Sequence, residues 1–168
     1  MKVIVFILLI PLISTAQNRP SPCNNNPVYR QFDFWIGTWE VYGLNGKKAG
    51  ESKIEMILDS CVILENWTGA NGNFTGKSFN SYNARTGQWQ QNWVDNMGGS
   101  TEYLKGSWQN GVMIFFTQPF NFKKDTVAVR KLSFHSLEKN KVRQHAEISK
   151  DGEKTWMTEY DLEYRRKE

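Results

Sequence analysis

The sequence predicts an all-β protein, a single antiparallel up-and-down β-barrel of about ten strands preceded by a short helical turn. Short runs rich in Val, Ile, Thr, Trp, Tyr and Phe alternate with short connections rich in Gly, Asn and Asp, such as "NARTG" and "KDGEK". Connections of this kind join antiparallel neighbours and are too short for crossovers. Because an open meander leaves two exposed edges and closure removes both, we expect a closed barrel.

The first residues have the layout of a secretory signal peptide. Lys2 precedes an apolar run over 3–13, and small residues stand at Ser14 and Ala16. The run is shorter than the about 20 apolar residues that a membrane-spanning helix needs. We therefore expect residues 1–16 to be a cleaved signal peptide, the protein to be secreted or periplasmic, and no part of it to insert into a membrane.

Two cysteines, Cys23 and Cys61, stand in this expected exported chain. An even number of cysteines in an oxidising compartment favours a disulfide over two free thiols. The bridge would tie an extended N-terminal segment over 17–28 to the barrel domain predicted over 29–168.

The stretch that leads into the barrel, "QFDFWIGTWEVY", is unusually aromatic. Asn26 and Pro27 precede it and Gly37 lies within it, an arrangement typical of one or two helical turns with an N-cap and a glycine stop. Beyond this turn we expect strands over residues 38–43, 51–58, 61–68, 75–82, 87–94, 100–108, 112–118, 126–135, 141–149 and 155–165.

Large rings and polar groups alternate along three consecutive predicted strands. Residues two apart in a strand share a face, so Glu65 lies on the same face as Trp67. A face that mixes rings with polar groups is typical of a small-molecule cavity, whereas a solid core would be plainly aliphatic. The alternative is that these polar groups face solvent. We predict a ligand site formed by Glu65, Trp67, Ser78, Asn80, Gln91, Trp93 and Asp95, with Arg130 and Gln144 from the opposite wall.

These residues predict an exported protein that binds a small, partly apolar ligand in the barrel without a cofactor. A second hypothesis is a cofactor-free enzyme of the isomerase or hydratase type, which uses Glu65 or Asp95 as its base. A carboxyl group against apolar rings has a raised pKa and can transfer protons near neutral pH. A third is a barrel with a filled core that serves as a protein-interaction surface. The sequence does not decide whether any reaction occurs, nor the oligomeric state.

Charge and histidine content exclude other classes. The net charge is +4, and the one basic cluster, Arg165 to Lys167, lies near the C-terminal end, so we expect no nucleic-acid partner. Two histidines cannot supply a three-histidine zinc site, and neither has the spacing of another metal set, so no metal site is predicted.

The segment Gly37–Thr38–Trp39 resembles the start of the first strand in lipocalins and related calycin barrels. That resemblance implies a barrel in which Trp39 packs across the closed end under an arginine of the last strand, here Arg165 or Arg166. The "IGTW" start also resembles nitrobindin-type haem barrels, which leaves a haem-binding barrel with His135 or His145 as the iron ligand as a further alternative.

The resemblance extends over residues 29–166. Segments including "FDFWIGTWEV", "GKSFNSYNARTGQWQQNWVDNMGG" and "YDLEYRR" are similar to an uncharacterised family of short exported bacterial proteins with lipocalin-like barrels. The run over 76–95 is the most specific part. The resemblance implies the fold and brings no activity with it.

Overall fold

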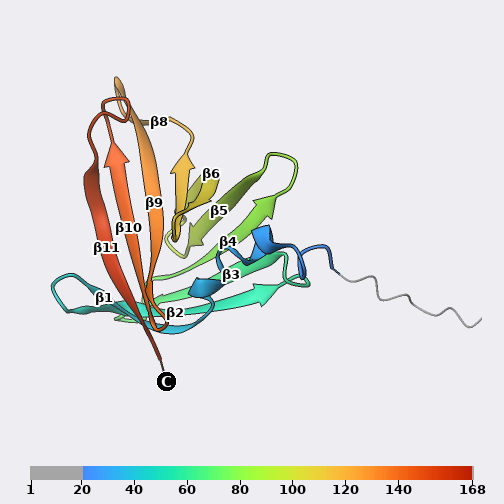
Figure 1. Ribbon diagram of the computed structural model, residues 1–168. Coiled ribbons are helices and arrows are strands. Elements are labelled where there is room, and N and C mark those ends of the chain that lie inside the picture. The colour runs from blue at the N-terminus through green and yellow to red at the C-terminus, as the bar shows by residue number, and fades with distance from the viewer. Residues whose placement is uncertain (1–20, 168) are drawn as a thin grey trace, which may run out of the picture.

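A computed structural model describes residues 21–167 and confirms the predicted fold class: ten antiparallel strands form a closed barrel (Figure 1). The signal peptide predicted over 1–16 lies outside the described residues. The strands are β1 Gly37–Gly43, β2 Lys48–Ile57, β3 Val62–Gly69, β4 Thr75–Asn83, β5 Gln88–Asp95, β6 Ser100–Gln109, β7 Val112–Thr117, β8 Phe120–Lys123, β9 Thr126–Glu138, β10 Lys141–Ser149 and β11 Met157–Arg166.

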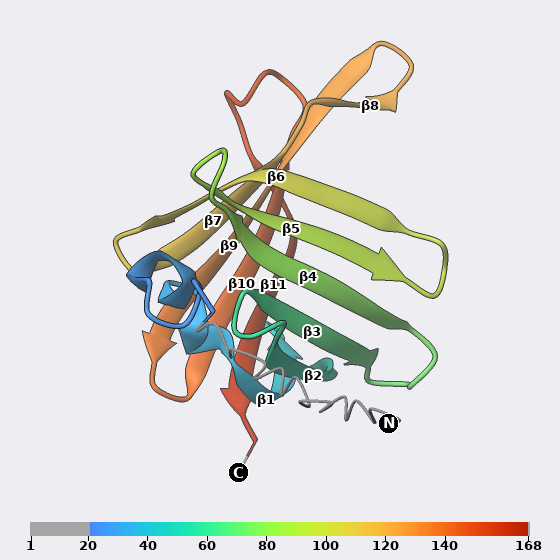
Figure 2. The ribbon, with the colours of Figure 1, turned by 90° about the vertical axis from the view of Figure 1, so that its right-hand side faces the viewer.

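The barrel closes because the last strand pairs with the first. Strand β11 runs antiparallel to β1, with Trp39 opposite Arg166 and Gly43 opposite Leu162. Each of the other barrel strands pairs with its neighbours in sequence, except that β7 pairs directly with β9. The intervening β8, which the sequence did not predict, pairs only with β9 and forms a hairpin that projects beyond the barrel (Figures 1 and 2).

Two short helical turns close one end of the barrel, as the sequence predicts. They are 3-10 helices, η1 Pro27–Arg30 and η2 Asp33–Trp35, and the side chain of Asn26 caps the first by accepting from the Val28 amide. Figure 2 shows them at one end of the barrel, with the β3–β4 and β5–β6 connections at the other.

The rings of this segment fill the closed end. Phe32 and Trp35 are completely buried and stack with ring centroids 5.0 Å apart. The Trp35 ring also packs 4.6 Å from Phe134 of β9. We call the cluster of Phe32, Trp35, Trp39, Phe115 and Phe134 the aromatic plug. It is the reason for the dense aromatic content just before β1.

The predicted stacking of an arginine on Trp39 is confirmed, and the arginine is Arg166. Its guanidinium lies 4.4 Å from the Trp39 ring centroid and donates to the Ile36 carbonyl at 3.1 Å. The indole Nε1 of Trp39 donates to the Trp35 carbonyl at 2.8 Å. Gly37 has φ 145°, and a Cβ there would collide with the Arg166 guanidinium, so this position requires glycine. The closed barrel with this contact is consistent with a calycin-like fold.

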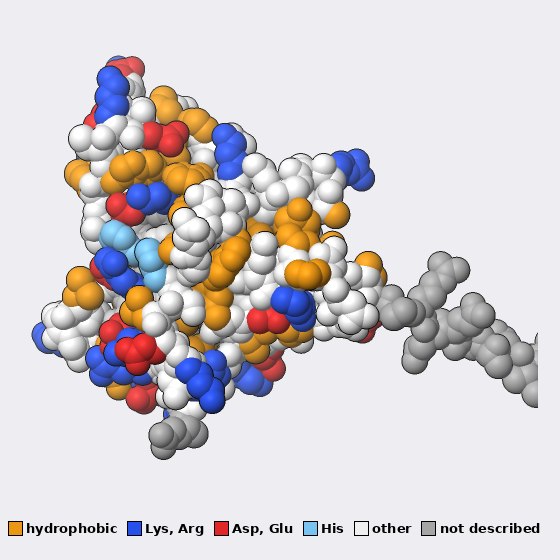
Figure 3. Space-filling view, in the orientation of Figure 1, with side chains coloured by type: hydrophobic (Ala, Val, Ile, Leu, Met, Phe, Trp, Pro, Cys, Tyr) orange, Lys and Arg blue, Asp and Glu red, His pale blue; other side chains and the backbone are white. Residues whose placement is uncertain are grey.

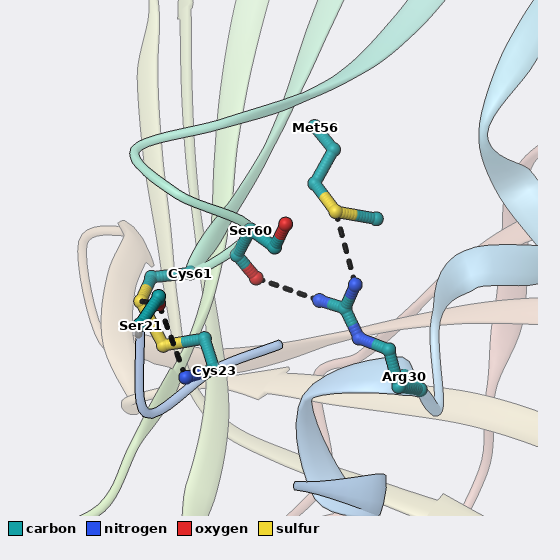
Figure 4. The surroundings of a disulfide bond; sticks show 6 residues. All are labelled: Ser21, Cys23, Arg30, Met56, Ser60 and Cys61. Carbon is teal, nitrogen blue, oxygen red and sulfur yellow. Dashed lines mark hydrogen bonds between the residues drawn. A yellow bond between two sulfur atoms is a disulfide. The ribbon is translucent and has the colours of Figure 1, made fainter. Parts of the chain in front are cut away.

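The predicted disulfide between Cys23 and Cys61 is present, with the two Cα atoms 5.1 Å apart (Figure 4). Residues 22–24 form a turn, so the predicted extended segment is not extended throughout its described part. Arg30 adds a second tie, because its Nη2 donates to the Ser60 carbonyl at 2.6 Å. Within residues 21–167, no helix is long and apolar enough to cross a membrane.

Replacing both Cys23 and Cys61 by serine should lower the free energy of unfolding. The bridge spans a sequence separation of 38 residues, for which loss of the loop-closure constraint costs about 4 kcal/mol. Urea unfolding monitored by tryptophan fluorescence measures the effect. Reduced wild-type protein should match the double variant. A variant as stable as the oxidised wild type would show that the bridge does not hold the N-terminal segment in place.

Candidate functional site

An internal cavity of about 810 Å³ occupies the part of the barrel that the aromatic plug leaves unfilled. It reaches the β3–β4 connection at Asn71 and the β5–β6 connection at Gly99, opposite the plugged end. Seven of the nine predicted site residues line it: Glu65, Trp67, Gln91, Trp93, Asp95, Arg130 and Gln144. The predicted Ser78 and Asn80 are fully buried and do not line the cavity, but both hydrogen-bond to residues that do.

Strand register brings these residues together. Glu65 on β3 stands opposite Ser78 on β4, which in turn stands opposite Trp93 on β5. One row further along, Asn80 stands opposite Gln91. Their shared face is the interior of the barrel, so the alternative that these polar groups face bulk solvent is wrong.

Two glycines make room for the two indole rings. The positions of a Cβ on Gly50 and on Gly76 are occupied by the six-membered rings of Trp67 and Trp93, respectively. Each indole therefore leans against the backbone of a neighbouring strand instead of filling the barrel. Both tryptophans remain partly exposed and line the cavity. The sequence alone does not identify these glycines, because the pairing that makes them necessary is a diagonal one between strands.

A chain of hydrogen bonds converges on the Glu65 carboxylate. Ser52 Oγ and Ser78 Oγ each donate to it at 2.9 Å, one to each oxygen. Asn80 Nδ2 donates to Ser78 Oγ at 3.0 Å, and Gln91 Nε2 donates to Asn80 Oδ1 at 2.7 Å. Ser52, Ser78, Asn80 and Gln91 thus form a connected and buried polar network around Glu65.

Tyr164 links this network to the aromatic plug. Its ring packs edge-on against Trp35, 6.0 Å between centroids. Its hydroxyl donates to Gln144 Oε1 at 2.7 Å and lies 3.4 Å from Glu65 Oε1. A phenol has one proton, so the shorter contact to Gln144 takes it, and the Tyr164 oxygen keeps its lone pairs.

Burial raises the pKa of Glu65 to about 7, and the hydrogen bonds from Ser78 and Ser52 oppose this increase only in part. The carboxyl is 3% exposed and forms no salt bridge with any residue in the described part of the chain. The predicted rise in pKa is therefore confirmed for Glu65.

The prediction of a raised pKa is wrong for Asp95. Its pKa is lowered, chiefly because the Gly99 amide donates to Oδ1 at 2.9 Å, with further hydrogen bonds from the Met97 amide and Trp93 Nε1. The side chain holds the β5–β6 turn at the cavity mouth. It is an ionised structural carboxylate, and its environment does not favour the role of a base.

Other groups line the cavity that the sequence identifies only in part. Arg130 Nε donates to both oxygens of Glu159, at 3.1 and 2.9 Å, so its charge is paired. Tyr103 on β6 stands opposite Gln91, and burial raises its pKa to about 12. Tyr160, Leu162 and Tyr164 also line the cavity. The spacing of two in "YDLEY" could have identified these three residues as one face of the last strand.

The two histidines lie outside the cavity. His135 and His145 stand opposite Arg143 and Ser133, respectively. The residue before each of them, Phe134 and Gln144, is buried and faces inward. His145 Nε2 contacts Thr158 Oγ1 at 2.9 Å. Histidine side chains are visible on the outer surface in Figure 3. Because neither imidazole lines the cavity, this geometry does not favour the haem alternative. Among residues 21–167 no group of three or more His, Cys, Asp or Glu side chains could hold a metal ion.

No known family model matches the chain, and no curated protein is significantly similar to it. A proposal about function therefore has to rest on the geometry of the cavity.

Replacing Glu65 by glutamine should change how stability depends on pH. The pKa of Glu65 rises from 4.5 to about 7 on folding, so the native state binds the proton more tightly than the unfolded state. Stability from this group is fully present below pH 4.5 and is lost as the pH rises to about 7, a difference of about 3 kcal/mol. Urea unfolding at several pH values measures it.

The Glu65→Gln variant should lack this component, so the difference in unfolding free energy between variant and wild type should grow from pH 4.5 to about 7 and then stay constant. A matched control is Glu55→Gln, because Glu55 lies on the exterior and pairs with Lys53. A pH-independent difference for Glu65→Gln would show that the carboxyl is ionised throughout.

Proposed function

We propose that this protein is an exported binding protein for a small, partly apolar ligand held inside the barrel. The observation that carries the proposal is the cavity of about 810 Å³, which lies within the size range of small-molecule sites. A barrel of ten strands encloses more space than its own inward side chains fill. Here the aromatic plug occupies one end only, and the remaining space is open at the other.

The composition of the cavity wall supports a ligand with both apolar and polar parts. Trp67, Trp93, Leu132 and Leu162 offer apolar surface. The buried Glu65, Gln91 and Gln144 offer a few oriented polar groups, as small-molecule sites usually do. A barrel that served only as an interaction surface would need a filled core, so the unfilled interior argues against that hypothesis.

The environment of Glu65 supports a second candidate function, that of a cofactor-free enzyme that transfers a proton. A carboxyl group with a pKa of about 7 at the wall of a cavity is suited to general acid–base catalysis. In this candidate Glu65 would be the acid or base, and Gln91 and Tyr164 would orient the substrate. Asp95, whose carboxylate accepts hydrogen bonds within the β5–β6 turn, would take no part in the reaction.

The proposal includes export and membership of the lipocalin-like bacterial family described above. The Cys23–Cys61 disulfide supports an oxidising compartment. The contact between Trp39 and Arg166 supports the relationship to calycin barrels.

A neutral fluorescent probe tests the proposed binding. N-phenyl-1-naphthylamine should bind in the cavity and quench the fluorescence of Trp67 and Trp93, since both indoles lie at the cavity wall. Trp67→Phe and Trp93→Phe should each remove a large part of this signal change. Replacement by alanine should weaken binding about tenfold, as expected for the loss of one aromatic contact surface.

Trp108→Phe is the matched control, because Trp108 lies against Phe34 at the plugged end of the barrel. It should leave both probe affinity and the signal change unaltered. If Trp67→Phe and Trp93→Phe also leave the signal unaltered, the probe does not occupy the cavity and the proposed site is wrong.

A further inference from the structure

The hydrogen bonds around Glu65 have a direction that can be traced from a fixed point. Asn80 Nδ2 lies 3.1 Å from the Ile63 carbonyl, a backbone group that can only accept. This contact identifies the nitrogen of the Asn80 amide, so the other atom, Oδ1, must accept from Gln91 Nε2. Every donor from Gln91 through Asn80 to Ser78 therefore points toward Glu65.

This direction has two consequences for the cavity. First, hydroxyls donate to both oxygens of Glu65, an arrangement that suits an ionised carboxylate. Second, Gln91 uses its amide nitrogen within the network, so its Oε1 remains as an acceptor that takes no part in the network. Gln91 is 3% exposed and lines the cavity, so this acceptor is available to a ligand there.

Three of the polar groups that line the cavity present acceptor oxygens. Glu65 contributes carboxylate oxygens and Gln91 contributes Oε1. The Tyr164 hydroxyl donates its hydrogen bond to Gln144, so its oxygen is also left as an acceptor. The Tyr164 oxygen lies 3.4 Å from Glu65 Oε1, and acceptor oxygens of this kind match the N–H donors of an ammonium group.

The site lacks a positive charge to match Glu65. No described lysine, arginine or histidine forms a salt bridge with it. Arg130, a cation on the cavity wall, is paired with Glu159 through Nε. A buried carboxylate that is surrounded by donors and has no counter-charge is costly, and a cationic ligand would remove that cost.

We propose that the ligand is an organic ammonium ion, a protonated amine whose charged head binds Glu65, Gln91 and Tyr164 and whose apolar body lies against Trp67 and Trp93. This inference rests on the proposed function and specifies the class of ligand. The indole rings contribute to the binding of both parts of the ligand, because their faces attract cations as well as apolar groups. Release is coupled to acidification, since protonation of Glu65 removes the charge that holds the ammonium.

The other titratable groups around Glu65 do not change charge near neutral pH. Tyr164 and Tyr160 from β11 and Tyr103 from β6 are phenols, which ordinarily titrate near about 10. Strands β2 and β4 contribute Ser52 and Ser78, which do not titrate. Arg130 and Glu159 form an ion pair on the opposite wall.

Three probes that share a phenylalkyl body and differ in their polar head group test this proposal: 4-phenylbutylamine, 4-phenylbutan-1-ol and 4-phenylbutanoate. Calorimetric titration at about pH 7.5, where an alkylamine is protonated, should show the amine binding at least about tenfold more tightly than the alcohol. The carboxylate should bind most weakly. At about pH 6, amine binding should release a proton, detected by comparing buffers of different ionisation enthalpy, because the ammonium favours ionised Glu65.

Glu65→Gln should bind amine and alcohol with similar affinity and release no proton. Glu55→Gln, on the exterior of the same sheet, should keep the preference for the amine. Equal binding of amine and alcohol by the wild type, or a preference for the carboxylate, would overturn the ammonium proposal and leave ligand binding in the barrel intact. If neither these probes nor N-phenyl-1-naphthylamine bind, the proposed function fails as well.

Discussion

The packing of the aromatic plug into one end of the barrel is the constraint on which the rest of the structure depends. Ten closed strands enclose more volume than their inward side chains fill, so one end needs additional apolar material. The segment before β1 supplies it with Phe32 and Trp35, which are completely buried. The disulfide and the Arg166 guanidinium hold that segment against the barrel. The cavity is the space that remains.

The plug also determines the electrostatics of the cavity. Tyr164 packs its ring against Trp35 and Trp39 and extends its hydroxyl to Gln144 and toward Glu65. Glu65 therefore lies where apolar rings exclude water and where the hydrogen-bond network surrounds its carboxylate. The carboxyl keeps hydrogen-bond partners but loses solvation, which raises its pKa. A group that is costly to bury and accessible from a cavity is more readily explained by a function than by stability.

The same wall shows how room is kept for a ligand. Trp67 and Trp93 would obstruct the interior if they projected across it, and Gly50 and Gly76 let them lean against the sheet instead. The aromatic surface of these two indoles thus remains exposed on the cavity wall and is not buried in the core. The Asp95 carboxylate holds the turn beside Trp93 and so stabilises the rim of the cavity.

The sequence by itself determined the features that depend on local periodicity and composition. Hairpin connections specified antiparallel strands, and the period of two placed Glu65 with Trp67 on one face. The pairing of Cys23 with Cys61 followed from their number in an expected exported chain. Other features were decided only by the tertiary structure, because they arise between strands distant in sequence. Closure of β11 on β1 made the predicted face the interior and brought Tyr164 to Glu65, and strand register placed Gly76 beneath Trp93. The two carboxyl groups looked alike in the sequence, but Glu65 lost solvent while Asp95 gained turn amides, and only three-dimensional surroundings separate their pKa values.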